Sequence, residues 1–281
     1  MGGSQFAHGT NLCDEPVNDP PPETSEEARR EQALWDRLLA LAASGRDDGP
    51  APNDPFWRLY EPIARGRGEP AFVVGQLGQS IDGRIATASG HSHYVNGPET
   101  IVHLHRLRAL VDAVIIGIGT VIADDPRLSV RQVQGRNPAR VVVDPRGMLP
   151  AKARLLEDAG VPVYAIQTAD HPRPQGVTVI TLPATAGRID PRAMVHALAG
   201  RGLRRLLIEG GADTLSSFLA AGALDRLHIA VAPLLIGSGV AGITLPAIDR
   251  LNQAIRPRVT LHRLGEDALF DCEFLKMPAP A

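Results

Sequence analysis

The chain has 281 residues, of which 44% are hydrophobic and 4% aromatic, and its formal net charge at pH 7 is −2. This length allows one large or two small domains with a substantial core, and the near-neutral charge gives no electrostatic steering toward nucleic acid. The two cysteines argue against a disulfide framework or a cysteine zinc site, and no apolar run is long enough to span a membrane. The N-terminus lacks the segments typical of a signal peptide, so we expect a cytoplasmic protein that binds neither nucleic acid nor membrane.

The N-terminal quarter of the chain is predicted to be an appendage. Residues 1–23 are rich in Pro, Asn, Asp and Glu, a composition typical of a disordered tail. Residues 24–68 are predicted to form a helical appendage with a linker, because a capping-box spacing at Thr24–Glu27 precedes apolar residues at helical period and Gly45 can end that helix. We expect it to pack on the main domain or on a partner subunit, and a substrate lid is the less favoured alternative.

From Pro70 onward, strand-like apolar runs alternate with helical segments. Strands are predicted at residues 72–78, 113–119, 139–144, 161–168, 177–182, 204–211 and 224–237, and helices at 98–111, 190–202 and 212–222. Residues 259–275 are predicted to form an antiparallel hairpin. Nearly continuous Val, Ile and Leu strands are typical of parallel sheets covered by helices on both faces. The sequence therefore predicts an α/β fold with a mostly parallel sheet, helices on both faces and an antiparallel C-terminal hairpin.

The turn at Glu209–Thr214 is the first candidate site, because ligands of open α/β sheets bind beyond the carboxyl ends of the strands. Its two glycines let a ligand approach the backbone, and the following helix N-terminus can bind a phosphate. The hydroxyl groups of Thr214, Ser216 and Ser217 add donors. A tight turn that only needs positive φ is an equally supported alternative.

The turn at Gly117–Pro126 begins like a dinucleotide-binding fingerprint, but Ile122 stands where the third glycine belongs, so we reject a Rossmann site. Asp124 and Asp125 are either two acids of a site or residues that end a helix before Pro126. The residues alone favour the second interpretation.

Four histidines between residues 91 and 105 suggest a metal site, but their spacing argues against one. His103 and His105 fall in a predicted helix, where residues two apart point about 200° away from each other. We predict no metal and expect surface or hydrogen-bonding histidines. Arginines near these turns suit an anionic substrate or cofactor phosphates, although ordinary solvation is the alternative for any single one: Arg106, Arg108, Arg127, Arg131 and Arg140.

Taken together, these turns resemble one family. SIDGRIATASGHSHYVNG, GTVIADDPRLSVR, RVVVD and LLIEGGADTLSSFL occur in the order found in the reductase domain of the bifunctional riboflavin-biosynthesis deaminase–reductase, the RibD C-terminal domain family. The resemblance implies a dihydrofolate-reductase-like fold, an NADPH-dependent reductase domain over residues 69–281 and a homodimer. It also implies reduction of the ribosyl group of 5-amino-6-(5-phosphoribosylamino)uracil, by hydride transfer to the sugar C1.

The resemblance also implies roles for individual residues. The substrate-binding positions are Gln76, Ser92, Arg108, Leu128, Arg131 and Glu209. The cofactor-binding positions are Gly78, Tyr94, Thr120, Asp124, Gly210, Gly211, Ala212, Asp213, Thr214, Leu215, Ser216 and Ser217. Arg146, which follows the strand RVVVD, is the candidate for the 2′-phosphate of NADPH, and Asp82 and Asp125 are the candidate proton donors.

Three features depart from the family pattern. Gln76 stands where the family often has lysine, the ESxW pattern is replaced by His91–Tyr94, and the appendage replaces the deaminase domain. Two alternatives therefore stay open. One is a reductase of the same fold acting on a dihydropterin or another heterocycle, and the other is a non-catalytic NADPH-binding or scaffold protein.

Overall fold

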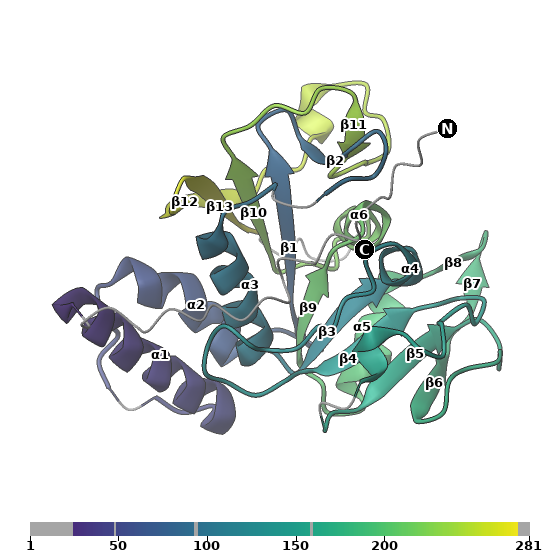
Figure 1. The fold of residues 1–281 in the computed structure, drawn as a ribbon, viewed down its shortest axis with the longest axis horizontal. Coiled ribbons are helices and arrows are strands. Elements are labelled where there is room, and N and C mark those ends of the chain that lie inside the picture. Colours follow the sequence, from purple (N-terminus) through teal and green to yellow (C-terminus); the bar gives the residue numbers. More distant parts are fainter. Residues whose placement is uncertain (1–24, 48, 93–94, 158–159, 275–281) are drawn as a thin grey trace, which may run out of the picture.

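The computed structural model describes residues 25–47, 49–92, 95–157 and 160–274 (Figure 1). The predicted disordered tail, residues 1–23, lies outside them. In this part of the chain, no helix combines the length and the apolar character needed to cross a bilayer.

A nine-stranded sheet forms the centre of the described structure, with strand order β12-β13-β10-β1-β9-β3-β4-β5-β6. The strands from β10 to β6 are parallel, and β13 and β12 add to β10 as an antiparallel pair, as predicted. Their bounds are β1 Phe72–Ser80, β3 Ala113–Gly117, β4 Ala139–Val143, β5 Val163–Gln167, β6 Val177–Thr181, β9 Arg205–Glu209, β10 Arg226–Ala232, β12 Arg258–Leu264 and β13 Asp267–Glu273. Strand β10 ends before the predicted boundary because Pro233, which follows it, has no N–H for the ladder.

Shorter elements complete the described chain. Two small pairs of strands are β2 Arg84–Thr87 with β11 Gly239–Ala241, and β7 Ala184–Thr185 with β8 Arg188–Ile189. The helices are α1 Glu26–Ser44, α2 Pro55–Arg65, α3 Pro98–Leu110, α4 Ile118–Asp124, α5 Pro191–Ala199 and α6 Ala212–Ala220, and 3₁₀ turns lie at Arg154–Leu156 and Leu251–Gln253.

Helices cover both faces of the sheet, as predicted. Successive residues of a strand point to opposite faces, so Val74 and Leu207 pack in one apolar cluster with α1, α2 and α3, whereas Val73 and Leu206 pack in the other with α5 and α6. Figure 1 shows α1, α2 and α3 together on one side of the sheet. The parallel order fixes the carboxyl ends of β1, β9, β3 and β4 at one common edge.

Helices α1 and α2 pack on the sheet-covering helix α3. The Ser25 hydroxyl accepts the N–H of Ala28 at the start of α1, and Gly45 ends that helix in the left-handed conformation. The Asp54 side chain caps α2 by accepting the N–H of Phe56. Trp35 and Tyr60 are buried in the same cluster as α3, so packing on the main domain is the arrangement observed.

Candidate active site

The turns after β3 and β9 lie against each other at the carboxyl edge of the sheet. A Cβ added at Gly117 would approach Thr214 Oγ1 to 2.5 Å, and one added at Gly211 would approach Thr120 Oγ1 to 2.8 Å. Gly210 and Gly211 have φ values of 71° and 72°, a conformation that favours glycine. Two motifs far apart in sequence, both predicted to bind cofactor, therefore share one location.

Helix α6 begins inside this location, with Gly211 as its N-cap. The first amides of a helix have no acceptor within the helix, so those of Ala212–Thr214 are suited to an anion. The next side chains have partners within the protein. Leu215 is fully buried in the core, the Ser216 hydroxyl accepts the N–H of Thr244 at 2.9 Å, and the Ser217 hydroxyl donates to Thr214 O at 2.8 Å.

A buried ion pair lies beside the β9 turn. Arg108 of α3 makes two hydrogen bonds to the Glu209 carboxylate, one of them from Nε to Oε2 at 2.8 Å, and its Nη1 donates to Ser129 O at 3.0 Å. Gln76 of β1 is the register partner of Glu209 and is buried. Three predicted substrate positions thus lie on the α3 side of the sheet, where the middle of β1 meets the end of β9.

The loop that carries Leu128 and Arg131 lies against α3. Leu128 is buried with a positive φ of 57°, so its side chain anchors the loop. The Arg131 guanidinium donates to Ser129 Oγ at 2.6 Å, and its backbone N–H donates to His105 Nδ1 at 3.0 Å. Burial, followed by the charges of Arg108 and Arg131, lowers the pKa of His105 to about 3, so this histidine is neutral and accepts through Nδ1.

The histidines of α3 are buried, so the expectation of surface side chains is wrong for them, while the expectation of hydrogen bonding is confirmed. His103 Nδ1 lies 2.7 Å from the Tyr60 hydroxyl, and its Nε2 lies 3.1 Å from His228 Nδ1. The His103 ring is covered by Tyr60 of α2, which packs over α3. In the described ranges, no three His, Cys, Asp or Glu side chains are grouped as metal ligands.

Two of the other predicted arginines have partners within the protein, which reduces the number of candidate anion-binding arginines. Arg106 pairs with Glu31 and lies over the Phe56 ring, and Arg140 is buried and donates to the backbone carbonyl groups of Leu155 and Glu157. Ordinary solvation is therefore also wrong for these two. Arg108 and Arg131 are the arginines whose contacts link them to the predicted substrate positions.

The two candidate proton donors have structural contacts. Asp82 accepts hydrogen bonds from the Ser80 hydroxyl and from the N–H groups of Ile236 and Gly237, and these bonds lower its pKa to about 2. Asp125 ends α4 in the left-handed conformation and accepts the N–H of Arg154 at 2.8 Å. Asp82 is thus an ionised acceptor at neutral pH, and the assignment of either residue as a proton donor stays a prediction.

Gly78, Asp124 and Arg146 lie in or directly after elements that end at the same edge. Gly78 is in β1, where a Cβ would come within 1.9 Å of Asn96 Oδ1. Arg146 is exposed in the turn after β4, the strand beside β3. Ser92 is half-buried, Asp124 is the last residue of α4, and Tyr94 lies outside the described residues.

Sequence reasoning missed the residues that fix the start of α3. Asp267 Oδ2 accepts from the Gly97 N–H at 2.9 Å, the Thr100 hydroxyl at 2.6 Å and the Asn96 amide at 3.1 Å. Asn96 also donates to Ala230 O at 3.2 Å. Asp267 is about 170 residues away from these donors in sequence, so no local pattern indicates this capping.

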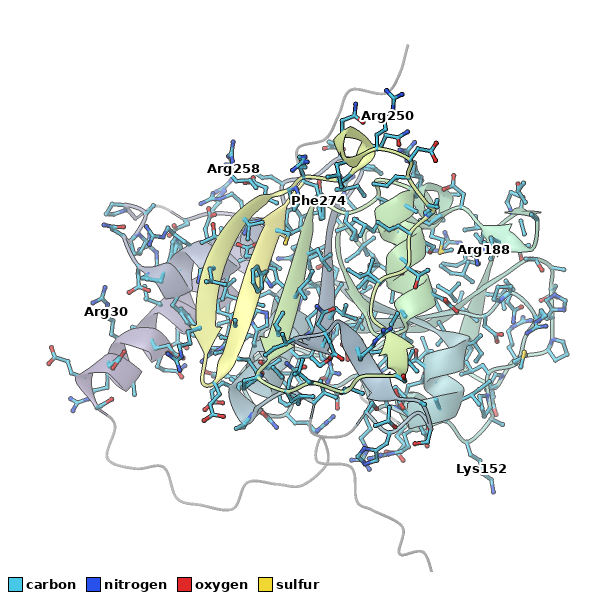
Figure 2. The ribbon with its side chains drawn as sticks, turned by 90° about the horizontal axis from the view of Figure 1, so that it is seen from above. Arg30, Lys152, Arg188, Arg250, Arg258 and Phe274 are labelled. Atoms are coloured by element: carbon cyan, nitrogen blue, oxygen red, sulfur yellow. The ribbon has the colours of Figure 1, made fainter. Side chains whose placement is uncertain are left out.

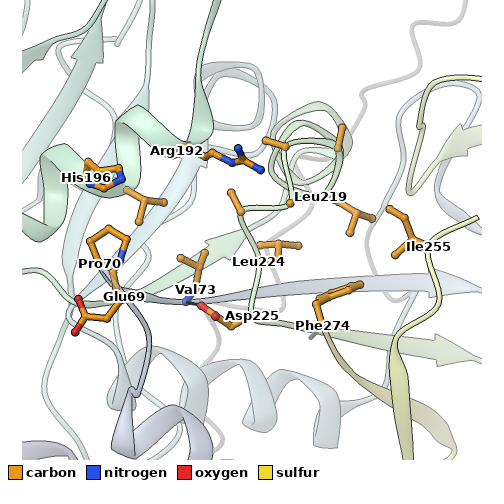
Figure 3. Close-up of a pocket in the computed structure, with 16 residues that line it drawn as sticks. Glu69, Pro70, Val73, Arg192, His196, Leu219, Leu224, Asp225, Ile255 and Phe274 are labelled. Carbon is orange, nitrogen blue, oxygen red and sulfur yellow. Dashed lines mark hydrogen bonds between the residues drawn. The ribbon is translucent and has the colours of Figure 1, made fainter. Parts of the chain in front are cut away.

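A cavity of about 540 Å³ lies at the opposite edge of the sheet, between the start of β1, one side of α5 and the C-terminal end of α6 (Figure 3). The residues that line this cavity include Glu69, Arg192, His196 and Phe274, which are labelled in Figure 3. None of the predicted site residues lines it. The candidate active site is therefore the group of turns at the carboxyl edge.

Comparison with known proteins identifies the family of the chain. The family model described as the RibD C-terminal domain matches residues 71–264. The 2,5-diamino-6-ribosylamino-4(3H)-pyrimidinone 5′-phosphate reductase of Methanothermobacter thermautotrophicus is 34% identical over 212 residues, which cover 71% of this chain and 96% of that protein. The riboflavin biosynthesis protein RibD of Escherichia coli is 30% identical over 219 residues, which cover 69% of this chain and 60% of that protein.

A solved structure gives the same assignment. RibD of Acinetobacter baumannii superposes with a TM-score of 0.63 at 27% identity, covering 77% of this chain and 61% of that one. The chain thus spans nearly all of the archaeal reductase and about three fifths of the RibD proteins. Since the family model covers most of the chain, from the first strand of the sheet to the end of β12, the chain belongs to the RibD C-terminal domain family.

Proposed function

We propose that the chain is an NADPH-dependent reductase of riboflavin biosynthesis, which reduces the ribosyl group of a 5′-phosphorylated ribosylaminopyrimidine to ribityl. The observation that carries this proposal is the meeting of Arg108, Glu209 and the Gly210–Thr214 turn at one edge of the sheet. Support for the reaction comes from the archaeal relatives, which are named as such reductases and are 34% and 35% identical.

The residues at the edge fit a dinucleotide phosphate cofactor. Gly211 has a conformation that suits glycine, and the α6 amides after it can bind a phosphate. The Thr120 hydroxyl faces the same glycine, and Arg146 offers an exposed guanidinium in the neighbouring turn. When bound, NADPH would supply the hydride.

The substrate lies, in this proposal, on the α3 side of β1 and β9. The exposed Arg131 binds the 5′-phosphate, and the buried Arg108–Glu209 pair forms the floor, where the Glu209 carboxylate accepts from sugar hydroxyl groups. Reduction adds a hydride to C1 of the open imine form and a proton to the neighbouring nitrogen. The protein holds C1 in place and excludes water from it.

The activity is tested with purified protein and NADPH. Two substrates are compared: the 2,5-diamino-pyrimidinone compound named for the archaeal relatives and the 5-amino-uracil compound implied by the resemblance. We expect NADPH oxidation with at least one of them and a much higher KM for the dephosphorylated form. Turnover of a dihydropterin alone would favour the heterocycle alternative, and NADPH binding without any turnover would favour a scaffold.

The assignment of Arg146 predicts cofactor preference. We expect Arg146→Ala to raise the KM for NADPH roughly tenfold to hundredfold, because a charge-assisted contact to the 2′-phosphate is lost. The KM for NADH should stay the same. Arg258→Ala, which removes an exposed arginine on β12 at the other end of the sheet, is the matched control. An unchanged preference for NADPH over NADH in Arg146→Ala contradicts the assignment.

We also propose that the chain forms a homodimer through the β12–β13 hairpin. Strand β12 is an edge of the sheet, and Leu261 is 63% exposed and stands opposite Phe270, which is 38% exposed. Val259 lies on the same face of β12 and is also exposed. Figure 2 shows this face of the hairpin without a covering helix. An exposed apolar edge of this kind is typical of an interface between subunits.

A further inference from the structure

Helix α1 contacts the loop that carries Arg131. The Trp35 indole N–H donates to Gln134 O at 2.9 Å, and the Leu39 side chain packs against the loop at Gly135. Trp35 is almost fully buried, so this hydrogen bond is shielded from water. The Asn137 side chain at the end of the loop accepts the Val130 N–H at 2.7 Å. This hydrogen bond ties the end of the loop to the residue next to Arg131.

Helices α1 and α2 also contact α3, the helix that carries Arg108. Arg106 of α3 pairs with Glu31 of α1 and lies 4.7 Å above the centre of the Phe56 ring of α2. The Tyr60 hydroxyl of α2 hydrogen-bonds His103, which precedes Arg108 by five residues on α3. These directional polar contacts fix the rotation and the height of α3, which apolar packing alone leaves less defined.

The contacts converge on the two arginines of the substrate site. Arg131 is held through its loop by α1, and through its own N–H by His105 of α3. Arg108 is carried by α3, whose position is fixed by the contacts with α1 and α2. The family match begins at residue 71, so both of these N-terminal helices belong to the part of the chain before it.

We propose that helices α1 and α2 are a positioning element of the substrate site, and that Trp35 is its positioning residue for the Arg131 loop. The inference rests on the proposed function for its effect on catalysis. It predicts that the N-terminal helices affect binding of the phosphorylated substrate and leave binding of NADPH unchanged, because the Gly210–Thr214 turn is not among their contacts described above.

The test compares two matched variants. Trp35→Phe removes the N–H that bonds Gln134 O, and Trp57→Phe makes the same change at a buried α2 residue whose ring contacts Arg37. Removal of the whole appendage is unsuitable because Leu38 and Tyr60 belong to the core. We expect Trp35→Phe to raise the KM for the phosphorylated substrate roughly threefold to tenfold, as for one lost hydrogen bond, with the KM for NADPH unchanged. Trp57→Phe should change neither KM.

Hydrogen exchange gives a second measurement that needs no turnover. The amides of Val130 and Arg131 are bonded to Asn137 and His105, so their exchange reports on the loop. Faster exchange of both in Trp35→Phe than in Trp57→Phe supports the positioning role. Equal exchange in the two variants overturns it, even in an active enzyme. An inactive wild-type protein with faster exchange in Trp35→Phe would instead reject the proposed function and keep the positioning role.

Discussion

Several aspartates of this fold act as acceptors for backbone N–H groups. Asp112 accepts from Arg204 and Arg205, Asp144 accepts from two amides of the following turn, and Asp82 accepts from Ile236 and Gly237. Hydrogen bonds of this kind favour the ionised carboxylate. At Asp82 they join the turn after β1 to the loop after β10, so this charge holds together two segments next to the candidate site.

Asp82 should make the stability of the protein depend on pH under acidic conditions. Its pKa is about 2 in the folded protein and about 3.9 in an unfolded chain. A carboxyl group with a depressed pKa stabilises the fold above its unfolded pKa, and this contribution disappears as the pH falls through the folded value. We therefore expect the melting temperature of the wild-type protein to exceed that of Asp82→Asn by a constant amount near neutral pH. The difference should shrink between about pH 4 and pH 2.

Ser80→Ala provides the comparison, because the hydrogen bond from Ser80 is the largest cause of the lowered pKa. In this variant the pH-dependent part should be smaller and should end at higher pH, because the folded pKa of Asp82 then lies closer to the unfolded one. Melting temperatures of the wild type, Asp82→Asn and Ser80→Ala, measured across the acid range, test both expectations. A difference between wild type and Asp82→Asn that stays the same at all pH values would show that the charge has no stabilising role.

The Arg108–Glu209 ion pair joins helix α3 to strand β9, and both side chains are nearly buried. Removing one partner of a buried pair leaves the other charge without compensation. We expect Arg108→Ala to lower the free energy of unfolding by about 3 kcal/mol. Arg258→Ala, which breaks an exposed pair with Glu273 on the β12–β13 hairpin, should cost at most about 1 kcal/mol.

Urea unfolding of both variants measures this contrast. The double variant Arg108→Ala/Glu209→Gln should recover part of the loss, because the remaining buried charge is then neutralised. Equal losses for the buried and the exposed pair would mean that Arg108 and Glu209 do not stabilise α3 on the sheet.

Elements with local signals could be predicted from the sequence. Alternating apolar strands and helices gave the order of the sheet-forming segments, and Gly45 ends α1 as predicted. The N-cap of α1 is Ser25, one residue after the position that the capping-box spacing at Thr24–Glu27 predicts. The short pair β2–β11 was missed because its strands are only four and three residues long and lie far apart in sequence. Such strands have too few residues for a period to appear.

The candidate site could be predicted only in part, for a related reason. Gly210 and Gly211 were recognisable because a turn with positive φ is a local requirement. The pairing of Arg108 with Glu209 joins residues 101 positions apart, and the capping of α3 by Asp267 spans even more of the chain. The burial of His103 depends on helices α1 and α2 covering α3, so no pattern around His103 itself could reveal it.

The arrangement of the complete sheet predicts how two copies meet. We expect Leu261→Asp to convert a wild-type dimer to a monomer, because it places a charge in the exposed apolar face of the β12–β13 hairpin. Leu251→Asp is the matched control, since Leu251 is 78% exposed but lies in a 3₁₀ turn outside the hairpin. Sedimentation analysis of the three proteins provides the measurement. A monomeric wild type, or a dimeric Leu261→Asp, would exclude this interface.

The contacts of Arg205 also bear on the order in which the chain can assemble during its synthesis. The Arg205 guanidinium donates to the carbonyl groups of Ala42 and Ala64, which the ribosome adds 163 and 141 residues earlier. At elongation rates of about 5 to 20 residues per second, α1 and α2 are made roughly 7 to 30 seconds before β9. Throughout that time the sheet lacks the strand between β1 and β3, so the apolar cluster that contains Trp35 and Tyr60 is incomplete. Nascent chains of this protein should therefore be substrates for ribosome-associated chaperones.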